Sequence, residues 1–261
     1  MKENGRPAYS TWIRKKRILY FWLLSASILL VGLAGGLVHL PLAAIALIAL
    51  PFIYIASIIS LAAYRFGDHG GRFQNKIHET VIASLNANGN VLDIGCGSGN
   101  LIIKIAKRNF GSHLGLDFWG HDWEYSKSQC ERNAQLEHVG NLRFLKGSAS
   151  ALPFASDSIQ NVVSCLTFHE VEDVADKTRS IAEALRVLEP NGRFAFFDLF
   201  ADPSFYPAQQ AVRASVEAAH GEIELMREYS KIEPLPFPLD SPKVLKYAVL
   251  IAGRKSEPQP G

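Results

Sequence analysis

Apolar residues are concentrated in one long segment near the N-terminus. From Ile18 to Tyr64 the chain has 47 residues without one Asp, Glu, Lys or Arg, whereas charged residues recur every few positions afterwards. A helix needs about 20 apolar residues to cross a bilayer, so this segment is long enough for two crossings. Proline cannot continue a helix interior and disfavours helical geometry in the residue before it. The break at Pro41 therefore predicts helices at about 18–38 and 42–63.

Basic residues flank this apolar segment. Residues 14–17 read Arg-Lys-Lys-Arg, and Arg65 follows the second predicted helix. The apolar core of a cleaved signal peptide spans only about 7 to 15 residues, so the segment is too long for one. Positive flanks favour the cytoplasmic side. We therefore expect residues 1–65 to form a basic N-terminal segment and a two-helix membrane hairpin, with both termini and the catalytic part in the cytoplasm.

After the hairpin, short apolar runs alternate with helical patterns. Val91–Ile94 is an apolar run that enters a glycine-rich turn, and residues 101–107 then have a helical pattern. Similar runs at 113–117, 161–166 and 193–197 predict further strands. Strands that alternate with helices are typical of α/β proteins with a parallel sheet.

Charge and cysteine content narrow the chemistry. The whole chain has 27 Lys and Arg against 25 Asp and Glu, but only Glu3 among the acidic residues precedes residue 66. The remainder is mildly acidic, which argues against a nucleic-acid substrate. The three cysteines are far apart and form no CxxC pair, and no histidines have metal-ligand spacing, so we expect reduced thiols and no metal site.

The glycine-rich turn predicts a nucleotide site. Gly95, Gly97 and Gly99 let the backbone approach a ligand closely, and their spacing is GxGxG rather than the GxGxxG of dinucleotide sites. Asp93 would repel a pyrophosphate but suits the ammonium of an amino-acid tail. Asp117 ends the next strand about 20 residues further on, where a carboxylate can accept hydrogen bonds from ribose hydroxyls. A nucleoside with an amino-acid tail is favoured, and NAD stays an alternative.

Four segments follow one another along the chain, and their combination is far more specific for a family than any one of them. They are VLDIGCGSGN, the acidic strand end at Asp117, FLKGSASALPFASDSIQNVVSCLTFHEV and LRVLEPNGRFAFFDLF. Over residues 75–200 the chain resembles class I S-adenosylmethionine-dependent methyltransferases. The resemblance implies S-adenosyl-L-methionine as cofactor and a Rossmann-like, three-layer fold of seven strands, mostly parallel with an antiparallel edge. We place this domain at 66–254, followed by a disordered tail at 255–261. The segments GLDFWG and YSKSQCERNAQLEHVGN are also similar to bacterial methyltransferase-like proteins with N-terminal membrane helices.

The resemblance assigns roles around the cofactor. It places Asp93, Gly95 and Gly97 at the methionine end, Asp117 at the ribose and Phe118 beside the adenine. The remaining expected cofactor neighbours are Cys96, Gly99, Ser148, Ala149, Cys165 and Leu166. Of these, Cys96 and Cys165 also fit a simpler role as small core residues. One position departs from the family, because Ser148 stands where an acidic residue usually meets the adenine amine.

Candidate catalytic residues follow the fourth and fifth predicted strands. Ligands of open α/β sheets bind at the carboxyl ends of strands, where His169 and Glu170 are candidates for the group that removes a proton from the acceptor. His169 alternatively packs or caps the next helix. Asp198 either orients the acceptor or caps the next turn. Methyl transfer from a sulfonium depends chiefly on alignment, so few catalytic residues are needed.

These patterns predict a methyltransferase whose acceptor is a membrane-associated small molecule or lipid. The main alternative is a non-catalytic, membrane-anchored scaffold or sensor that binds S-adenosylmethionine. An NAD-dependent oxidoreductase is a third interpretation. The acceptor, the accepting atom and the oligomeric state do not follow from the sequence.

Overall fold

The computed structural model describes residues 5–85, 88–120 and 123–257. The chain forms two compact units. The hairpin unit contains Ser10–Asn75 and Pro236–Leu239, and the sheet unit contains the chain up to Tyr9, Lys76–Leu235 and the chain from Asp240. This division differs from the predicted boundary at 65/66, because residues 5–9 belong with the sheet and residues 66–75 belong with the hairpin.

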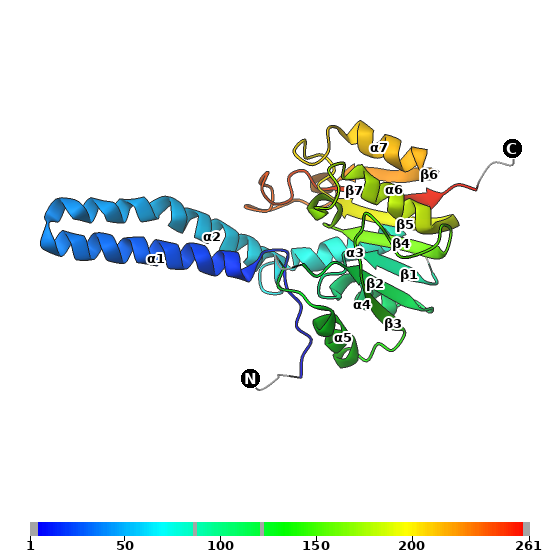
Figure 1. The fold of residues 1–261 in the computed structure, drawn as a ribbon, viewed down its shortest axis with the longest axis horizontal. Coiled ribbons are helices and arrows are strands. Elements are labelled where there is room, and N and C mark those ends of the chain that lie inside the picture. Colours follow the sequence, from blue (N-terminus) through cyan, green and yellow to red (C-terminus); the bar gives the residue numbers. More distant parts are fainter. Residues whose placement is uncertain (1–4, 86–87, 121–122, 258–261) are drawn as a thin grey trace. The chain divides into compact units, whose positions relative to one another are not determined.

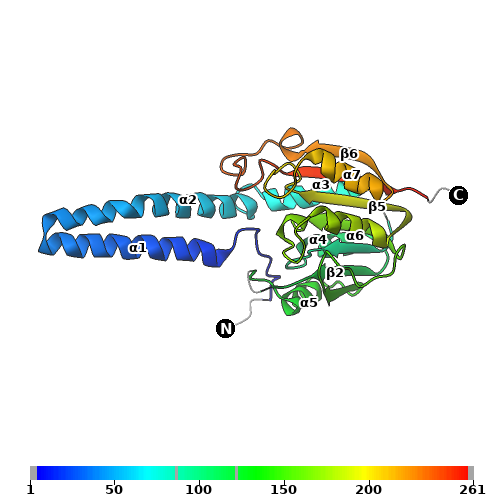
Figure 2. The ribbon, with the colours of Figure 1, turned by 45° about the horizontal axis from the view of Figure 1, so that its top comes forward.

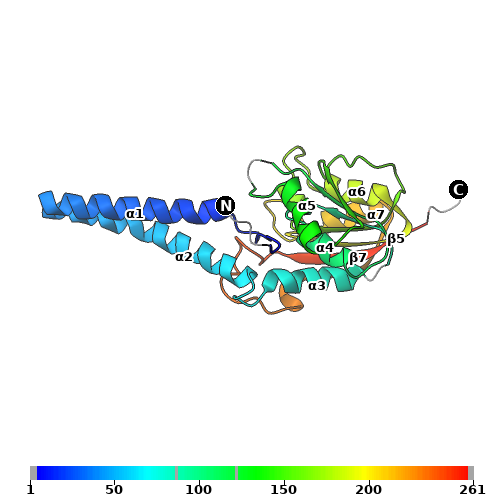
Figure 3. The same cartoon turned by 90° about the horizontal axis from the view of Figure 1, so that it is seen from below.

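The hairpin unit consists of two long helices joined by a tighter one. Helices α1 (Lys15–Val38) and α2 (Ala49–Phe66) run alongside each other in Figure 1, Figure 2 and Figure 3. The connecting 3-10 helix η1 (Leu40–Ile48) has Pro41 in its first turn, where a missing N–H costs no hydrogen bond. The second predicted helix, 42–63, therefore needs correction: its first part is a 3-10 helix, and α2 ends three residues later than expected.

Glycines allow the helices of the hairpin to pack closely. A Cβ atom on Gly32 would overlap the backbone of Ala46, and one on Gly36 would lie 2.9 Å from the Cβ of Ala43. The GxxxG pair thus serves packing between α1 and η1 within the hairpin. Trp22 Nε1 also donates a hydrogen bond to Ser60 Oγ across the two helices, at 3.1 Å.

The outward surface of the hairpin is apolar. Leu37, Val38 and Leu40 are 91, 86 and 80% exposed, and a surface of this kind is rarely left to water. Residues 15–38 and 40–66 are long and apolar enough to cross a membrane, and only 11% of each segment's most apolar stretch is buried. A core helix of a soluble protein would be mostly buried.

We expect Gly32→Val to separate α1 from η1, because the larger side chain has no room beside Ala46 and overpacking costs about 1–3 kcal/mol. Spin labels at Leu30 and Leu50, both exposed, should show a broader distance distribution in the variant. Leu33→Val, on the exposed side of α1, is the matched control and should leave the distribution unchanged. Equal distributions in all three proteins would contradict the packing role of Gly32.

The sheet unit has a seven-stranded mixed sheet in the order β3-β2-β1-β4-β5-β7-β6. Strands β1 to β5 are parallel, and β7 is antiparallel to both β5 and β6, which confirms the predicted fold class. The strands are β1 (Val91–Ile94), β2 (His113–Asp117), β3 (Leu142–Lys146), β4 (Ile159–Cys165), β5 (Leu188–Asp198), β6 (Gly221–Glu228) and β7 (Val249–Lys255). The helices are α3 (Phe73–Leu85), α4 (Asn100–Ala106), α5 (Lys127–Leu136), η2 (Phe168–Glu170), α6 (Thr178–Val187), α7 (Gln209–Ala218) and η3 (Tyr229–Lys231).

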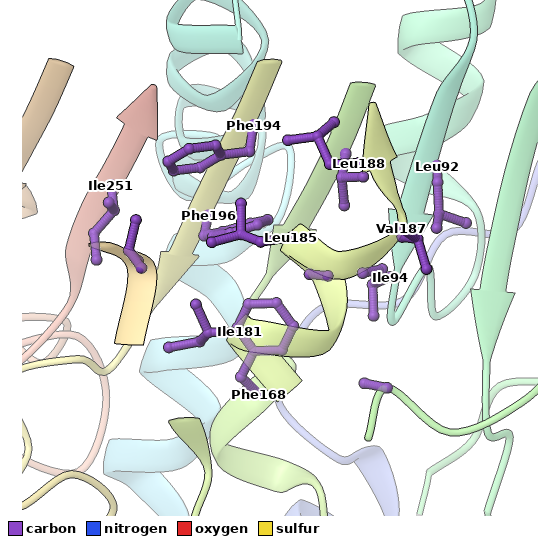
Figure 4. Packing of buried hydrophobic residues seen from close by; sticks show 14 of the residues in the cluster. Leu92, Ile94, Phe168, Ile181, Leu185, Val187, Leu188, Phe194, Phe196 and Ile251 are labelled. Atoms are coloured by element: carbon purple, nitrogen blue, oxygen red, sulfur yellow. The ribbon is translucent and has the colours of Figure 1, made fainter. Parts of the chain in front are cut away.

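The central strands are apolar on both faces, as expected for a sheet covered by helices on each side. Helices α6 and α7 lie side by side (Figure 2). Ile181 and Leu185 of α6, one helical turn apart, belong to the same buried apolar cluster as Phe194 and Phe196 of β5 (Figure 4). Burial of such side chains stabilises by roughly 1.5–3 kcal/mol each, and this core holds the strand ends in place.

The last strand corrects the predicted start of the tail. Lys255 ends β7 and is buried, and its Nζ donates hydrogen bonds to Leu185 O at 2.8 Å and to Leu188 O at 2.9 Å. Its ammonium also pairs with Asp157 at 2.6 Å. Residue 255 therefore belongs to the folded domain, and residues 258–261 of the predicted tail lie outside the described residues.

Candidate functional site

The parallel topology brings the carboxyl ends of β1, β2, β4 and β5 to one edge of the sheet. The turn after β1 contacts both neighbouring strands. Gly95 N and Cys96 N donate to Leu116 O of β2, at 2.7 and 3.1 Å. Gly95 has a φ of +78°, and a Cβ atom there would overlap Thr167, which follows β4. Only glycine satisfies both requirements, so this residue fixes how closely the turn approaches β4.

Asp117 holds the other side of the turn. Its Oδ2 accepts a hydrogen bond from Gly97 N at 2.8 Å, and its Oδ1 accepts one from Trp119 N at 2.7 Å. Burial raises the pKa of Asp117, while the N–H groups of Trp119 and Gly97 act in the opposite direction. A carboxylate oxygen has more than one acceptor site, so each can still accept a hydroxyl of a ribose.

Asp93 is the uncompensated group of the site. Its side chain is 1% exposed, and neither carboxyl oxygen has a hydrogen-bond partner of normal geometry in the described part of the chain. Burial and the carboxylate of Asp117 raise the pKa of Asp93 to about 8, against a smaller opposing effect of Ile102 N–H. A buried carboxyl group without partners is costly, and a cationic ligand would compensate it.

The expected adenine side has an exposed aromatic ring and a series of hydrogen-bonded side chains, two hydroxyl groups and a carboxylate. Phe118 is 64% exposed, so its ring is available for stacking. Ser148 Oγ lies 2.9 Å from Ser150 Oγ, which donates to Asp173 Oδ2 at 2.7 Å. Asp173 thus supplies a carboxylate that is connected through one hydroxyl group, that of Ser150, to Ser148, the position at which the acidic residue expected from the resemblance is missing.

The other expected cofactor neighbours lie close to the same edge. Cys96, Ala149 and Cys165 are buried, and burial raises the pKa of both thiols. Leu166, directly after β4, has a φ of +54° and donates from its N–H to Phe197 O at 2.7 Å. Gly99, with a φ of +83°, is the N-cap of α4.

Asp198 caps the short helix η2, which follows β4 and is not the turn after β5 that its position in the sequence suggested. Its carboxylate accepts hydrogen bonds from the backbone N–H of Phe168 at 2.7 Å, of Thr167 at 3.1 Å and of Leu199 at 2.6 Å, and it also bonds His169 Nδ1. These partners occupy most of its acceptor capacity. Asp198 is therefore placed to orient His169 rather than an acceptor.

His169 lies between two carboxylates. Its Nδ1 bonds Asp198, its Nε2 lies 3.6 Å from Glu170 Oε1, and its ring packs 5.0 Å from that of Phe205. Burial is the largest single effect and lowers the pKa of His169, but the carboxylates of Asp198 and Glu170 together outweigh it and raise the pKa to about 10. An imidazolium has no lone pair to accept a proton. The geometry therefore favours a hydrogen-bond donor over the general base expected from the sequence.

Sequence reasoning missed three side chains that shape the turn. Trp119 Nε1 donates to Gly97 O at 3.0 Å, Thr167 packs against Gly95, and Asn133 Nδ2 donates to Ser98 O at 2.9 Å. No sequence pattern marks Thr167 or Asn133, because each acts through a contact with a residue more than 30 positions away. A Trp directly after the strand-end Asp117 and Phe118 was the one available signal.

Comparisons with known proteins agree on the fold and on one domain. Residues 92–196 match a family model described as "Methyltransferase domain". The chain is 32% identical over 111 residues to a ubiquinone/menaquinone biosynthesis C-methyltransferase of Rickettsia bellii, an alignment that covers 42% of this chain and 44% of the relative. It is 33% identical over 112 residues to an O-methyltransferase of Aspergillus nomiae, with 43 and 47% covered. The chain thus spans less than half the length of these curated relatives.

A solved structure shows the same fold. The geranyl diphosphate C-methyltransferase of Streptomyces coelicolor, crystallised with S-adenosyl-L-homocysteine, superposes with a TM-score of 0.58 at 13% identity, over 72% of this chain and 81% of that one. At this identity the likeness concerns the fold alone.

We expect the wild type to lose stability relative to Asp93→Asn as the pH rises from 5 to 6.5 in the absence of ligand. The pKa of Asp93 is about 8 in the folded state and 3.8 unfolded, so its carboxyl group holds an extra proton in the folded state and contributes a loss of up to about 1.4 kcal/mol per pH unit. Asp93→Asn removes this contribution and keeps those of His78 and His113, whose lowered pKa values act in the opposite direction in this window. Denaturant unfolding of both proteins at several pH values measures the difference between their free energies of unfolding. Parallel profiles for both proteins would contradict the raised pKa.

Proposed function

We propose that this chain, whose residues 92–196 belong to the class I S-adenosylmethionine-dependent methyltransferases, transfers a methyl group to an apolar small-molecule acceptor at a membrane surface. The observation that carries the proposal is the buried, unpartnered carboxyl group of Asp93 beside the glycine turn. A methionine tail brings an ammonium to such a site, and an NAD pyrophosphate brings further negative charge. The NAD interpretation is therefore disfavoured.

The residues present fit the cofactor in three places. Asp93 would hold the ammonium, and Asp117 retains acceptor capacity for the ribose hydroxyls. Phe118 offers an exposed ring for the adenine, with Ser148 on the other expected side. When bound, S-adenosylmethionine supplies an electrophilic methyl group on a sulfonium. The protein's own task is then to align the acceptor, exclude water and manage one proton.

His169 has a defined part in this task. As a cation held by Asp198, it would donate a hydrogen bond to an anionic oxygen of the acceptor, such as a phenolate or enolate, and stabilise it in the bound state. The acceptor's nucleophilic atom forms the new bond to the methyl carbon as the bond to sulfur breaks, and that electron pair stays on sulfur. Glu170, whose side chain is 40% exposed, is placed to pass the acceptor's proton to water.

An apolar acceptor fits both the hairpin and the names of the relatives. Those names include a ubiquinone/menaquinone biosynthesis C-methyltransferase, and a structural neighbour is a geranyl diphosphate C-methyltransferase. The two long apolar helices with basic flanks would hold the domain at a membrane with both termini in the cytoplasm. Anchoring would raise the local concentration of an acceptor dissolved in that membrane.

The alternative function is a membrane-anchored protein that binds S-adenosylmethionine without turnover. Its specific support is Ser148, which replaces the usual acidic contact to adenine, and the high pKa of His169, which removes the expected base. The two functions differ in whether S-adenosylhomocysteine accumulates.

Asp117→Ala should weaken binding of S-adenosylmethionine by about 1–3 kcal/mol, because buried ribose hydroxyls and the N–H of Gly97 lose their acceptor. Calorimetric titration of the full chain in lipid nanodiscs measures this loss. Asp202→Ala, which removes an exposed carboxylate bonded to Ser204, should bind like the wild type. An unchanged dissociation constant in Asp117→Ala would overturn the placement of the ribose.

Turnover tests the function itself. The full chain in nanodiscs, given S-adenosylmethionine labelled in its methyl group and a quinol-containing membrane lipid extract, should release S-adenosylhomocysteine and label a lipid-soluble product. His169→Gln should lower this rate by about 100-fold, because loss of a cation beside the acceptor's hydroxyl group raises the pKa of that hydroxyl by about 2 and leaves less of the reactive anion; the variant should retain cofactor affinity. His220→Gln, an exposed histidine at the far end of the sheet unit, is the control. Cofactor binding without any labelled product would favour the scaffold.

A further inference from the structure

Residues 8 and 9, which precede the hairpin, are hydrogen-bonded to helix α5 and its C-terminal cap within the sheet unit. Ala8 N donates to Asn133 Oδ1 at 2.8 Å, and Ala8 O accepts from Asn133 Nδ2 at 3.0 Å. Gln129 Nε2 donates to the same carbonyl at 2.6 Å, and Tyr9 OH donates to Glu137 Oε1 at 3.3 Å. We call residues 5–9 the N-terminal strap. It precedes the hairpin in sequence, yet three side chains of α5 and its C-terminal cap hold it.

Asn133 connects the strap to the glycine turn. Its Nδ2 also donates to Ser98 O at 2.9 Å, and the side chain is 1% exposed. One buried amide therefore pairs with both backbone groups of Ala8 and with the peptide just before the N-cap of α4. Cys130, one turn earlier in α5, contributes a second contact from its thiol to Gly97 O at 3.0 Å.

We infer that the N-terminal strap and Asn133 position the glycine turn for cofactor binding, so that the cofactor site is built from segments on both sides of the hairpin. The inference rests on the proposed function. Glycine restricts the backbone less than any other residue, and the turn has three glycines within five positions. Its conformation must then be held by hydrogen bonds from neighbouring side chains.

The strap matters because Asn133 cannot be satisfied by the turn alone. Its carboxamide oxygen accepts from Ala8 N, and its amide nitrogen divides its two protons between Ala8 O and Ser98 O. Without the strap, a buried oxygen would lack a donor and the amide would be free to rotate away from Ser98. Leaving a buried polar group unmatched costs about 1–3 kcal/mol.

The test uses the full chain in nanodiscs and two readouts. Hydrogen exchange of the amides of residues 95–99 reports the turn without any ligand, and calorimetry with S-adenosylhomocysteine reports the cofactor site. Asn133→Ala removes both connections. Gln129→Ala removes a bond to the strap from a residue whose side chain, within the described part of the chain, makes no hydrogen bond to the turn. Asn141→Ala is the matched control, because it also removes a side-chain bond to a loop carbonyl, Gly111 O at 2.9 Å.

Asn133→Ala should speed exchange of the turn amides by about tenfold and weaken S-adenosylhomocysteine binding by about tenfold. Gln129→Ala should speed exchange of the turn amides and weaken S-adenosylhomocysteine binding by about threefold each. Asn141→Ala should change the exchange rate and the affinity by less than about twofold. A positioning role requires the turn to loosen while exchange in the strands β4 and β5 stays as in the wild type. If Asn133→Ala does not fold, the amide exchange of the turn in Gln129→Ala tests the role of the strap.

Two results separate this inference from the proposed function. Turn amides that exchange at the wild-type rate in the folded variants would overturn the role of the strap, whatever happens to affinity. Faster exchange in a protein that binds no S-adenosylhomocysteine even as wild type would support the strap and refute the cofactor.

Discussion

The site is organised around a carboxyl group that the protein itself does not neutralise. Asp93 is buried in the central strand β1, beside the second carboxylate of Asp117, and neither of its oxygens has a hydrogen-bond partner among the described residues. The other two carboxyl groups of this edge have partners: Asp117 accepts from two N–H groups, and Asp198 bonds several N–H groups and His169. The uncompensated position is thus the place where a cationic ligand gains most.

The carboxylate of Asp198 connects segments of the protein instead of being left for a ligand. Asp198 joins the end of β5 to the residues that follow β4, and the same oxygens that cap η2 also hold the imidazole of His169. The carboxylate of Asp198 thus accepts hydrogen bonds from backbone N–H groups at the start of η2 and binds the ring of His169 at the same time. An ordered imidazolium at the sheet edge follows from the cap, because the cap keeps an anion buried beside the ring.

The sequence predicts what depends on short-range pattern. The strand ending at Asp117, the glycine turn and the seven-stranded fold follow from local apolar runs and a resemblance. The pattern does not predict the protonation of His169, which depends on the Asp198 carboxylate 29 positions away. It also fails for the boundary of the domain, because residues 5–9 have no periodic apolar pattern and carry no signal for docking on α5. Long-range hydrogen bonds to backbone groups leave no periodicity in a sequence.

The two compact units also change how the domain is defined. A domain drawn from the end of the hairpin would omit the strap, although Ala8 shares its amide partner with the glycine turn. The hairpin is therefore an insertion into the sheet unit rather than an extension at its end. Both ends of the hairpin are joined to the sheet unit, because the chain leaves it after Tyr9 and re-enters it at Lys76.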